Sequence, residues 1–236
     1  MHRDSAWPVA AMRITAIEEQ PRSRRLKLVL DGGCAVPVSR EVLARFTLLA
    51  GDEITDGRLR ELEEAEAHHL ALSSALHLLA YRPRSEAELR ERLARKGVRP
   101  DVLGAAIARL RELSLIDDAA FARTWVEGRE RTSPRSRRLL ASELRAKGVQ
   151  AAVAQRSAEM VDEAGAAYRA ALKRAAALKS APYAEFRRKL GDLLMRRGFE
   201  YETASAAIGR LREELRGGQG REELRGGQGP ADGEID

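Results

Sequence analysis

One short pattern occurs three times in this chain: a leucine, two residues, a basic residue, a glycine and an apolar residue. Its copies are LARKGV at 93–98, LRAKGV at 144–149 and LMRRGF at 194–199. The glycines Gly97, Gly148 and Gly198 are 51 and 50 residues apart. A glycine after a helical stretch favours a left-handed cap, and the next apolar residue packs back on the last turn. A fixed period of this length predicts repeated helical units that share cores with their neighbours.

Each repeat is predicted to contain a helix, a short loop, a second helix, the glycine stop and a third helix. In the first repeat, Leu72, Leu76 and Leu79 recur at helical spacing, and Pro83 ends that helix. In the second repeat Pro134 stands 51 residues after Pro83. Abundant Ala, Leu and Arg with 4% aromatics also favour helices. The predicted fold class is mainly α: tandem three-helix repeats with a small β-containing N-terminal module.

The N-terminal module is predicted from short strand patterns that the rest of the chain lacks. The expected strands are 13–20, 26–30 and 34–39. A turn at Asp31 to Gly33 joins the second strand to the third, and Pro37 restricts the third strand to a sheet edge. A helix over 39–46, with Ser39 as its N-cap, is expected to follow.

The predicted domain organisation has seven segments. They are a disordered stretch or extension at 1–12, the β-containing module at 13–56, a linking helix at 57–69, the three repeats at 70–118, 119–163 and 164–215, and a disordered tail at 216–236. Met12 is an alternative start to Met1. The tail is assigned because REELRGGQG occurs at 212–220 and again at 221–229, and its glycines and charges predict flexibility.

Positive charge increases along the repeats. Residues 70–118 hold nine Lys and Arg against seven Asp and Glu, whereas residues 164–212 hold eleven against four. A basic repeat array favours an anionic partner such as nucleic acid, and the alternative is an arginine-rich solvated surface.

Candidate binding residues follow from the arginines around the loop and second helix of each repeat. Arginine suits phosphate and carboxylate groups because its planar fork donates paired hydrogen bonds. The candidates for contact with nucleic acid or another anionic partner are Arg82, Arg84, Arg135, Arg137, Arg138, Lys147, Arg187, Arg188, Arg196 and Arg197. The alternative is that these arginines pair within the chain with Glu86, Glu88, Glu91 and Glu143.

Catalytic, metal and membrane signals are weak in this sequence. Asp117 and Asp118 stand at a helix start, where an N-cap role is favoured over acid–base chemistry. His68, His69 and His77 lack a nearby cysteine to complete a metal set, and the single Cys34 fits a reducing cytoplasm. No run reaches the roughly 20 apolar residues that a membrane span needs. We therefore expect a cytoplasmic, non-enzymatic protein without metal or cofactor.

Three long segments of the repeat array carry a family resemblance. They read YRPRSEAELRERLARKGV at 81–98, LIDDAAFARTWVEGR at 115–129 and LLASELRAKGV at 139–149. Residues 70–162 thereby resemble the RecX family of bacterial regulators of RecA, and the strand-rich N-terminus suits its longer members. The resemblance implies an array of three-helix units that lies along the groove of the RecA filament on DNA. It also implies hindered RecA ATPase and strand exchange, limited filament growth and no catalytic residues.

Three functional hypotheses follow. The first is a regulator that binds RecA and RecA–DNA filaments, on single- or double-stranded DNA, in homologous recombination, DNA repair and the SOS response. The second is a stand-alone nucleic-acid-binding protein with helix-turn-helix-like units, although no helix offers an evident base-reading set of Asn, Gln and Arg. The third is an adaptor that self-associates through its N-terminal module.

Overall fold

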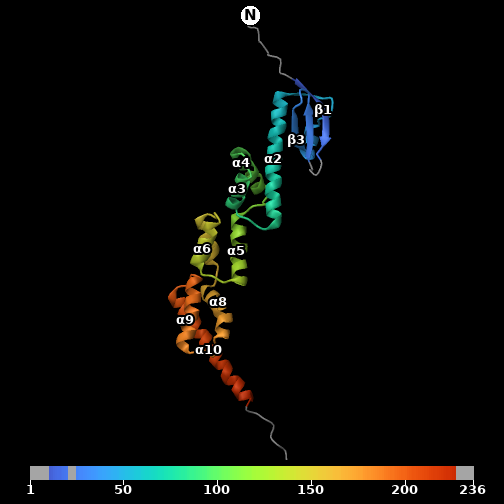
Figure 1. Cartoon of the computed structure of the whole chain (residues 1–236). Coiled ribbons are helices and arrows are strands. Elements are labelled where there is room, and N and C mark those ends of the chain that lie inside the picture. The colour runs from blue at the N-terminus through green and yellow to red at the C-terminus, as the bar shows by residue number, and fades with distance from the viewer. Residues whose placement is uncertain (1–10, 21–24, 227–236) are drawn as a thin grey trace, which may run out of the picture. The chain divides into compact units, whose positions relative to one another are not determined.

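The computed structural model describes residues 11–20 and 25–226, with side chains up to Gly217. The chain divides into two compact units. The first comprises Met1–Arg84 and Glu88–Ile116, and the second comprises Ser85–Ala87 and Asp117–Asp236. The predicted fold class is confirmed, because helical repeats follow a small β-sheet module (Figure 1). Each unit is described by itself below.

The first unit begins with a four-stranded antiparallel sheet of order β3-β2-β1-β4. The strands are β1 (Ala11–Glu19), β2 (Arg25–Leu30), β3 (Ala35–Ser39) and β4 (Glu53–Thr55). The three predicted strands are confirmed, and Pro37 lies on the edge strand β3 as expected. Strand β4 was missed because it has three residues, of which only Ile54 is buried. Strand β1 starts at Ala11, and residues 1–10 lie outside the described residues.

Helix α1 (Arg40–Phe46) follows β3, and the predicted N-cap residue Ser39 is confirmed, although its side chain bonds elsewhere. Ser39 stands at the N-cap position, but its side chain makes no cap hydrogen bond. Its hydroxyl instead donates to Glu66 Oε2 at 2.5 Å, and its backbone N–H donates to the same oxygen at 2.8 Å. The Arg25 guanidinium lies 3.1 Å from Glu66 Oε1. Glu66 is 5% exposed, so a buried carboxylate satisfies the end of β3.

Helix α2 (Asp56–Tyr81) contains both the predicted linking segment and the first helix of repeat 1. The helix is continuous because its interior contains no glycine or proline after Gly57. Its N-terminal half buries Leu62 against the sheet core, and its C-terminal half packs Ala75 with the next two helices. These are α3 (Glu86–Arg95) and α4 (Pro100–Glu112).

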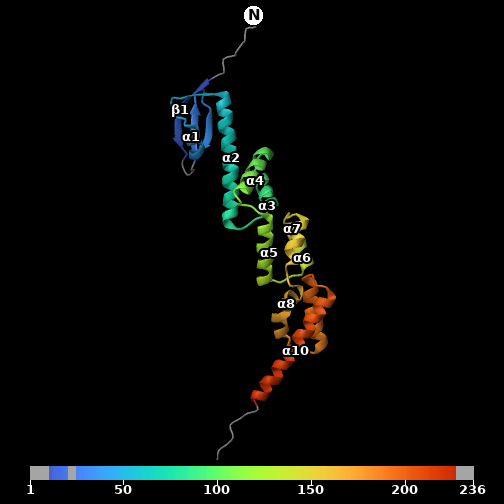
Figure 2. The ribbon, with the colours of Figure 1, turned by 180° about the vertical axis from the view of Figure 1, so that it is seen from behind.

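The second unit contains six helices in its described part (Figure 2). They are α5 (Asp118–Thr132), α6 (Arg137–Ala146), α7 (Ala151–Glu159), α8 (Glu163–Ala177), α9 (Tyr183–Arg196) and α10 (Tyr201–Gly226). Asp117 caps α5 by accepting from the backbone N–H of Ala119 at 2.7 Å, as predicted. One hydrophobic cluster runs from Leu140 and Leu144 of α6 to Leu190 and Leu194 of α9, so repeats 2 and 3 share a core.

Helix α10 extends further than predicted. It continues to Gly226, so the first part of the expected disordered tail is helical. Glu213 to Arg216 are good helix formers, and they carry the helix from repeat 3 into the duplicated segment. Residues 227–236 lie outside the described residues.

The repeated turn motif ends a helix in every repeat, as predicted. Gly97, Gly148 and Gly198 have φ of 80°, 79° and 85°. The apolar residue after each glycine donates its N–H to the motif's leucine carbonyl, at 3.2 Å for Val98, 3.0 Å for Val149 and 3.1 Å for Phe199. This bond pattern is a Schellman cap, which explains why glycine and an apolar residue recur together.

Candidate partner-binding surface

The third turn motif docks against the start of α6 within the second unit. Ser136, the N-cap of α6, donates its backbone N–H to the Arg197 carbonyl at 3.0 Å. A Cβ added at Gly198 would lie 2.6 Å from Ser136 Oγ and 2.9 Å from Leu139 Cβ. Only glycine fits this approach without displacing α6, so the motif joins repeat 3 to repeat 2 as well as ending a helix.

The second turn motif makes an equivalent contact with Ser85–Ala87, which belong to the second unit. The Ser85 hydroxyl donates to the Lys147 carbonyl at 2.5 Å. A Cβ added at Gly148 would lie 2.1 Å from Ala87 Cβ. At Gly97, by contrast, an added Cβ meets nothing within 4 Å. The same motif is therefore a docked turn in repeats 2 and 3 and an open turn in repeat 1.

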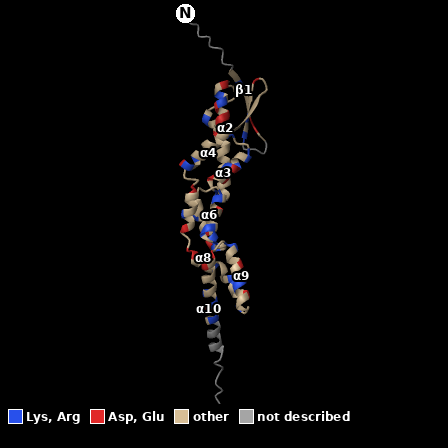
Figure 3. Cartoon of the chain, turned by 90° about the vertical axis from the view of Figure 1, so that its left-hand side faces the viewer, with Lys and Arg blue, Asp and Glu red and all other residues tan. Residues whose placement is uncertain are grey.

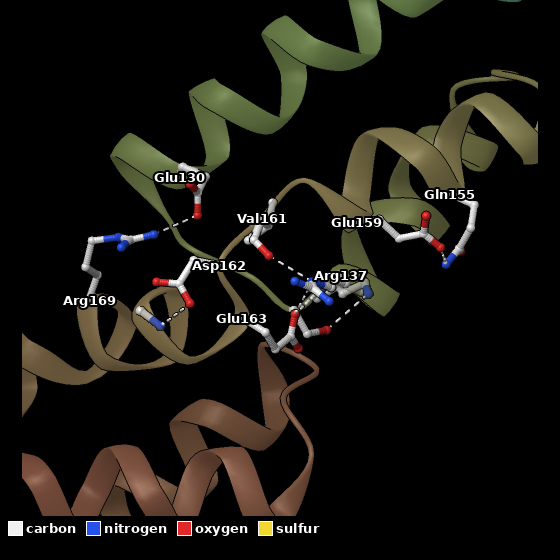
Figure 4. A network of polar contacts seen from close by, with 11 residues as sticks. Glu130, Arg137, Gln155, Glu159, Val161, Asp162, Glu163 and Arg169 are labelled. Carbon is white, nitrogen blue, oxygen red and sulfur yellow. Dashed lines mark hydrogen bonds and ion pairs between the residues drawn. The ribbon is translucent and has the colours of Figure 1, made fainter.

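A polar network around Arg137 also holds repeats 2 and 3 together (Figure 4). The Arg137 backbone N–H donates to Glu163 Oε2 at 2.8 Å, and its Nε donates to the Val161 carbonyl at 2.8 Å. Nearby, Arg169 donates to Glu130 Oε1 at 2.8 Å. Arg137 is thus occupied inside the second unit, and its main role in the structure is to tie α6 to the start of α8.

Glu143 on α6 accepts hydrogen bonds from three side chains, two on α5 and one in the loop before α6. Its Oε2 accepts from Trp125 Nε1 at 3.0 Å and from Arg129 Nε at 2.9 Å. Its Oε1 accepts from Arg135 Nη1. The Arg129 and Lys147 cations lie 4.7 Å and 5.1 Å from the Trp125 ring centroid, within cation–π range. Arg135 and Lys147 are therefore half-buried parts of an internal cluster.

The two candidate arginines of repeat 1 have different surroundings. Arg82 makes a paired bond to Glu88, at 2.9 Å from Nη1 and 3.2 Å from Nη2, and this hydrogen bonding raises the Arg82 pKa. Arg84 is 8% exposed and donates Nε to the Leu78 carbonyl at 3.0 Å. Burial, followed by the nearby charges of Arg82 and Arg92, lowers the Arg84 pKa.

Comparison of the repeats explains why Arg84 has no carboxylate partner at the position where Arg135 has one. Arg135 stands 51 residues after Arg84, and Glu143 stands 51 residues after Arg92. Repeat 1 therefore has an arginine where repeat 2 has the carboxylate that pairs with Arg135. As a result, Arg84 Nη1 has no hydrogen-bond partner in the described part of the chain.

Besides Arg137, which is exposed but bonded within the second unit, four candidate arginines are exposed there: Arg138 on α6 and Arg187, Arg188 and Arg196 on α9. Among the described residues, the side chains of Arg138 and Arg196 make no hydrogen bond or ion pair, and Arg188 approaches Asp192 only to 3.9 Å. Arg187 donates to the Tyr201 hydroxyl at 2.5 Å. We call these four residues the basic surface. Figure 3 shows Lys and Arg on both helices.

The docked turn places the end of α9 against the start of α6, where Arg138 and Arg196 stand in the sequence. Arg138 directly precedes Leu139, and Arg196 stands two residues before Gly198, whose contact with Leu139 joins α6 to α9. Arg197 follows Arg196 and directly precedes Gly198, and its side chain is half-buried. Burial lowers the Arg197 pKa, and the nearby charge of Arg135 lowers it further. Arg197 is thus a docking residue rather than part of the basic surface.

One feature of the second unit was missed from the sequence. A groove of about 450 Å³ lies between α9 and α10, with Gly191, Met195, Tyr201 and Ile208 among its lining residues. The sequence signal that could have indicated this groove was Gly191 and Met195, which had no predicted role in the helix over 183–197. We call this feature the α9–α10 groove.

The described residues provide no metal or membrane element. Among them, no group of three His, Cys, Asp or Glu could hold a metal ion. None of the helices in the described ranges is both long and apolar enough to cross a membrane.

Comparisons with known proteins identify the repeats. Family models match them in order: "RecX, first three-helix domain" at residues 71–110, the second at 117–157 and the third at 162–208. The third match extends the resemblance beyond residue 162, where the sequence pattern had ended.

Curated relatives and solved structures agree with these matches. Regulatory protein RecX of Levilactobacillus brevis is 32% identical over 208 residues, which are 84% of this chain and 76% of the relative. The Bacillus subtilis protein of the same name is 29% identical over 205 residues, 85% of this chain and 78% of the relative. A crystal structure of regulatory protein RecX has a TM-score of 0.62 at 26% identity, covering 82% of this chain and 97% of that one.

Proposed function

Because the chain belongs to the RecX family of regulatory proteins, we propose that it is a non-enzymatic regulator of RecA. In this proposal it binds RecA and RecA–DNA filaments and restrains ATPase activity, strand exchange and filament growth during recombination and the SOS response. The observation that carries the proposal is the ordered match of three RecX domains to consecutive parts of the chain.

The geometry of the second unit supports binding to a repeating partner. Repeats 2 and 3 are joined by the docked turn and by one continuous core, so they present their second helices in a fixed relation. A filament also repeats its subunits, and a fixed pair of similar units can contact successive subunits in similar ways. The basic surface supplies charge toward DNA phosphates or acidic protein groups.

A binding measurement tests this proposal directly. Purified protein, labelled at its single cysteine Cys34, is titrated with RecA filaments on single-stranded DNA and with the same DNA bare. We expect tighter binding to the filament than to bare DNA. Equal or tighter binding to bare DNA would favour a stand-alone nucleic-acid-binding protein and contradict the proposal.

Replacement of Arg138, Arg188 and Arg196 together by alanine is expected to weaken filament binding. The expected loss is on the order of tenfold near 0.1 M salt, because three exposed cations leave the contact, and it shrinks as salt rises. Arg135 and Arg137 are excluded because their side chains bond within the unit, to Glu143 and to the Val161 carbonyl. All three replaced residues are exposed, so stability should change little.

A matched control removes the same charge elsewhere in the second unit. Lys173, Arg174 and Lys179, on α8 and just after it, are also exposed and also total three cations. Their joint replacement by alanine should leave filament binding within about twofold. Equal weakening by both triple variants would assign the effect to net charge and remove the basic surface from the proposal.

A further inference from the structure

The α9–α10 groove is an open apolar hollow on a charged unit. Its floor is formed by Gly191 of α9 with Ala204 and Ile208 of α10. Met195 and Tyr201 line it and remain 53% and 63% exposed. The two helices are direct neighbours (Figure 3). Large apolar side chains exposed around a hollow are typical of a surface that another molecule covers.

Small residues keep the groove open. A Cβ added at Gly191 would meet nothing within 4 Å, so the space above this residue is empty. Gly191 lies within α9, where glycine destabilises a helix by roughly 1 kcal/mol relative to alanine. The glycine therefore weakens α9 without being required by a turn or by close packing, and its one structural effect is to deepen the groove.

The charges around the groove select the partner. The charged residues that line the groove are two cations, Arg187 and Arg188, and one carboxylate, Asp192. Arg187 also donates to the Tyr201 hydroxyl at 2.5 Å, which holds the tyrosine beside the opening. Residues 164–212, which include both helices, contain eleven Lys and Arg against four Asp and Glu. The groove therefore favours an acidic partner that also carries an apolar group to pack against Ala204 and Ile208.

These features favour protein over nucleic acid. A phosphate backbone has no apolar side chain to place against Ile208 and Met195, whereas an acidic protein segment offers both an apolar anchor and carboxylates for the arginines. We propose that the α9–α10 groove binds an acidic segment of a protein partner, which inserts an apolar side chain beside Gly191. The proposal rests on the proposed function, in which that partner is a protein subunit of the RecA filament.

The test fills the groove without disturbing the fold. Gly191→Phe places a ring in the empty space, and Gly191→Ala leaves the groove open while it also replaces the glycine by a better helix former. Both variants and the wild type are titrated with RecA filaments on single-stranded DNA and with the same DNA bare, after thermal melts confirm folding. We expect Gly191→Phe to weaken filament binding at least tenfold with bare-DNA binding unchanged, and Gly191→Ala to match the wild type.

The outcomes separate this inference from the proposed function. If the wild type does not bind filaments, both the proposed function and the filament as the groove's partner are rejected. If the wild type binds and Gly191→Phe binds equally well, the groove inference alone is overturned. If Gly191→Phe loses filament and bare-DNA binding in parallel, the groove contacts DNA and the protein-segment inference is again overturned.

Discussion

Gly198→Ala is expected to lower the free energy of unfolding of the second unit by about 3 kcal/mol, the sum of two effects. Gly198 has φ of 85°, where a Cβ costs roughly 1–2 kcal/mol. The new methyl would also lie 2.9 Å from Leu139 Cβ and 2.6 Å from Ser136 Oγ. Leu139 Cβ is fixed to the α6 backbone, so repeats 2 and 3 must move apart, and such overpacking costs roughly 1–3 kcal/mol.

Tryptophan fluorescence can follow this loss. Trp125 packs against the core of the second unit, and Trp7→Phe removes the other tryptophan of the chain. Gly97→Ala is the matched control, because Gly97 has φ of 80° but no neighbour within 4 Å of an added Cβ. Its cost should be the strain alone, measured by urea unfolding with circular dichroism. Equal losses in the two variants would show that the docked turn contributes nothing to joining the repeats.

Glu66→Ala is expected to destabilise the N-terminal module by about 3 kcal/mol, because removal of a buried charged partner leaves several donors unsatisfied. The Glu66 carboxylate accepts both the backbone N–H and the hydroxyl of Ser39, and it lies 3.1 Å from the Arg25 guanidinium. The contact fixes α2 to the end of β3. Its loss should therefore loosen the sheet from the helix.

The module offers its own reporter for this measurement. Cys34 is exposed between β2 and β3, and a dye attached there responds to unfolding of the sheet. Glu63→Ala is the control, since Glu63 is an exposed glutamate on the same helix. Its unfolding midpoint should match the wild type. A Glu66→Ala midpoint that also matches would contradict the anchoring role of this carboxylate.

The local features of the fold were predictable from sequence, and features set by distant contacts were not. The turn motif was predicted because leucine, glycine and the next apolar residue lie within six positions and form one Schellman cap. Ser39 is the N-cap residue of α1 as predicted, but its hydroxyl donates to Glu66, 27 positions away, instead of capping the helix. No local pattern identifies that partner. Strand β4 was missed because its three residues are too few for a pattern, and its pairing with β1 about 40 positions earlier is also a distant contact.

The candidate surface was predictable in type but not in detail. Arginine clustering correctly located charge on α6 and α9, but it could not show which cations pair inside the unit. Arg137 donates its backbone N–H to Glu163 at the start of α8, 26 positions away, and Glu143 accepts from Arg129, Arg135 and Trp125 outside its own helix. These are tertiary contacts, so spacing along one helix does not predict them. Whether the exposed arginines bind RecA or DNA stays a prediction.

The central claim, regulation of RecA, is tested most directly by the DNA-dependent ATPase activity of RecA. Full-length protein is added to RecA filaments on single-stranded DNA at ratios below one per RecA subunit, and ATP hydrolysis is followed over time. A RecA regulator of this family should slow hydrolysis at these substoichiometric ratios, and the Arg138, Arg188 and Arg196 triple variant should require more protein for the same effect. ATP hydrolysis that is unchanged even at equimolar protein would contradict the claim.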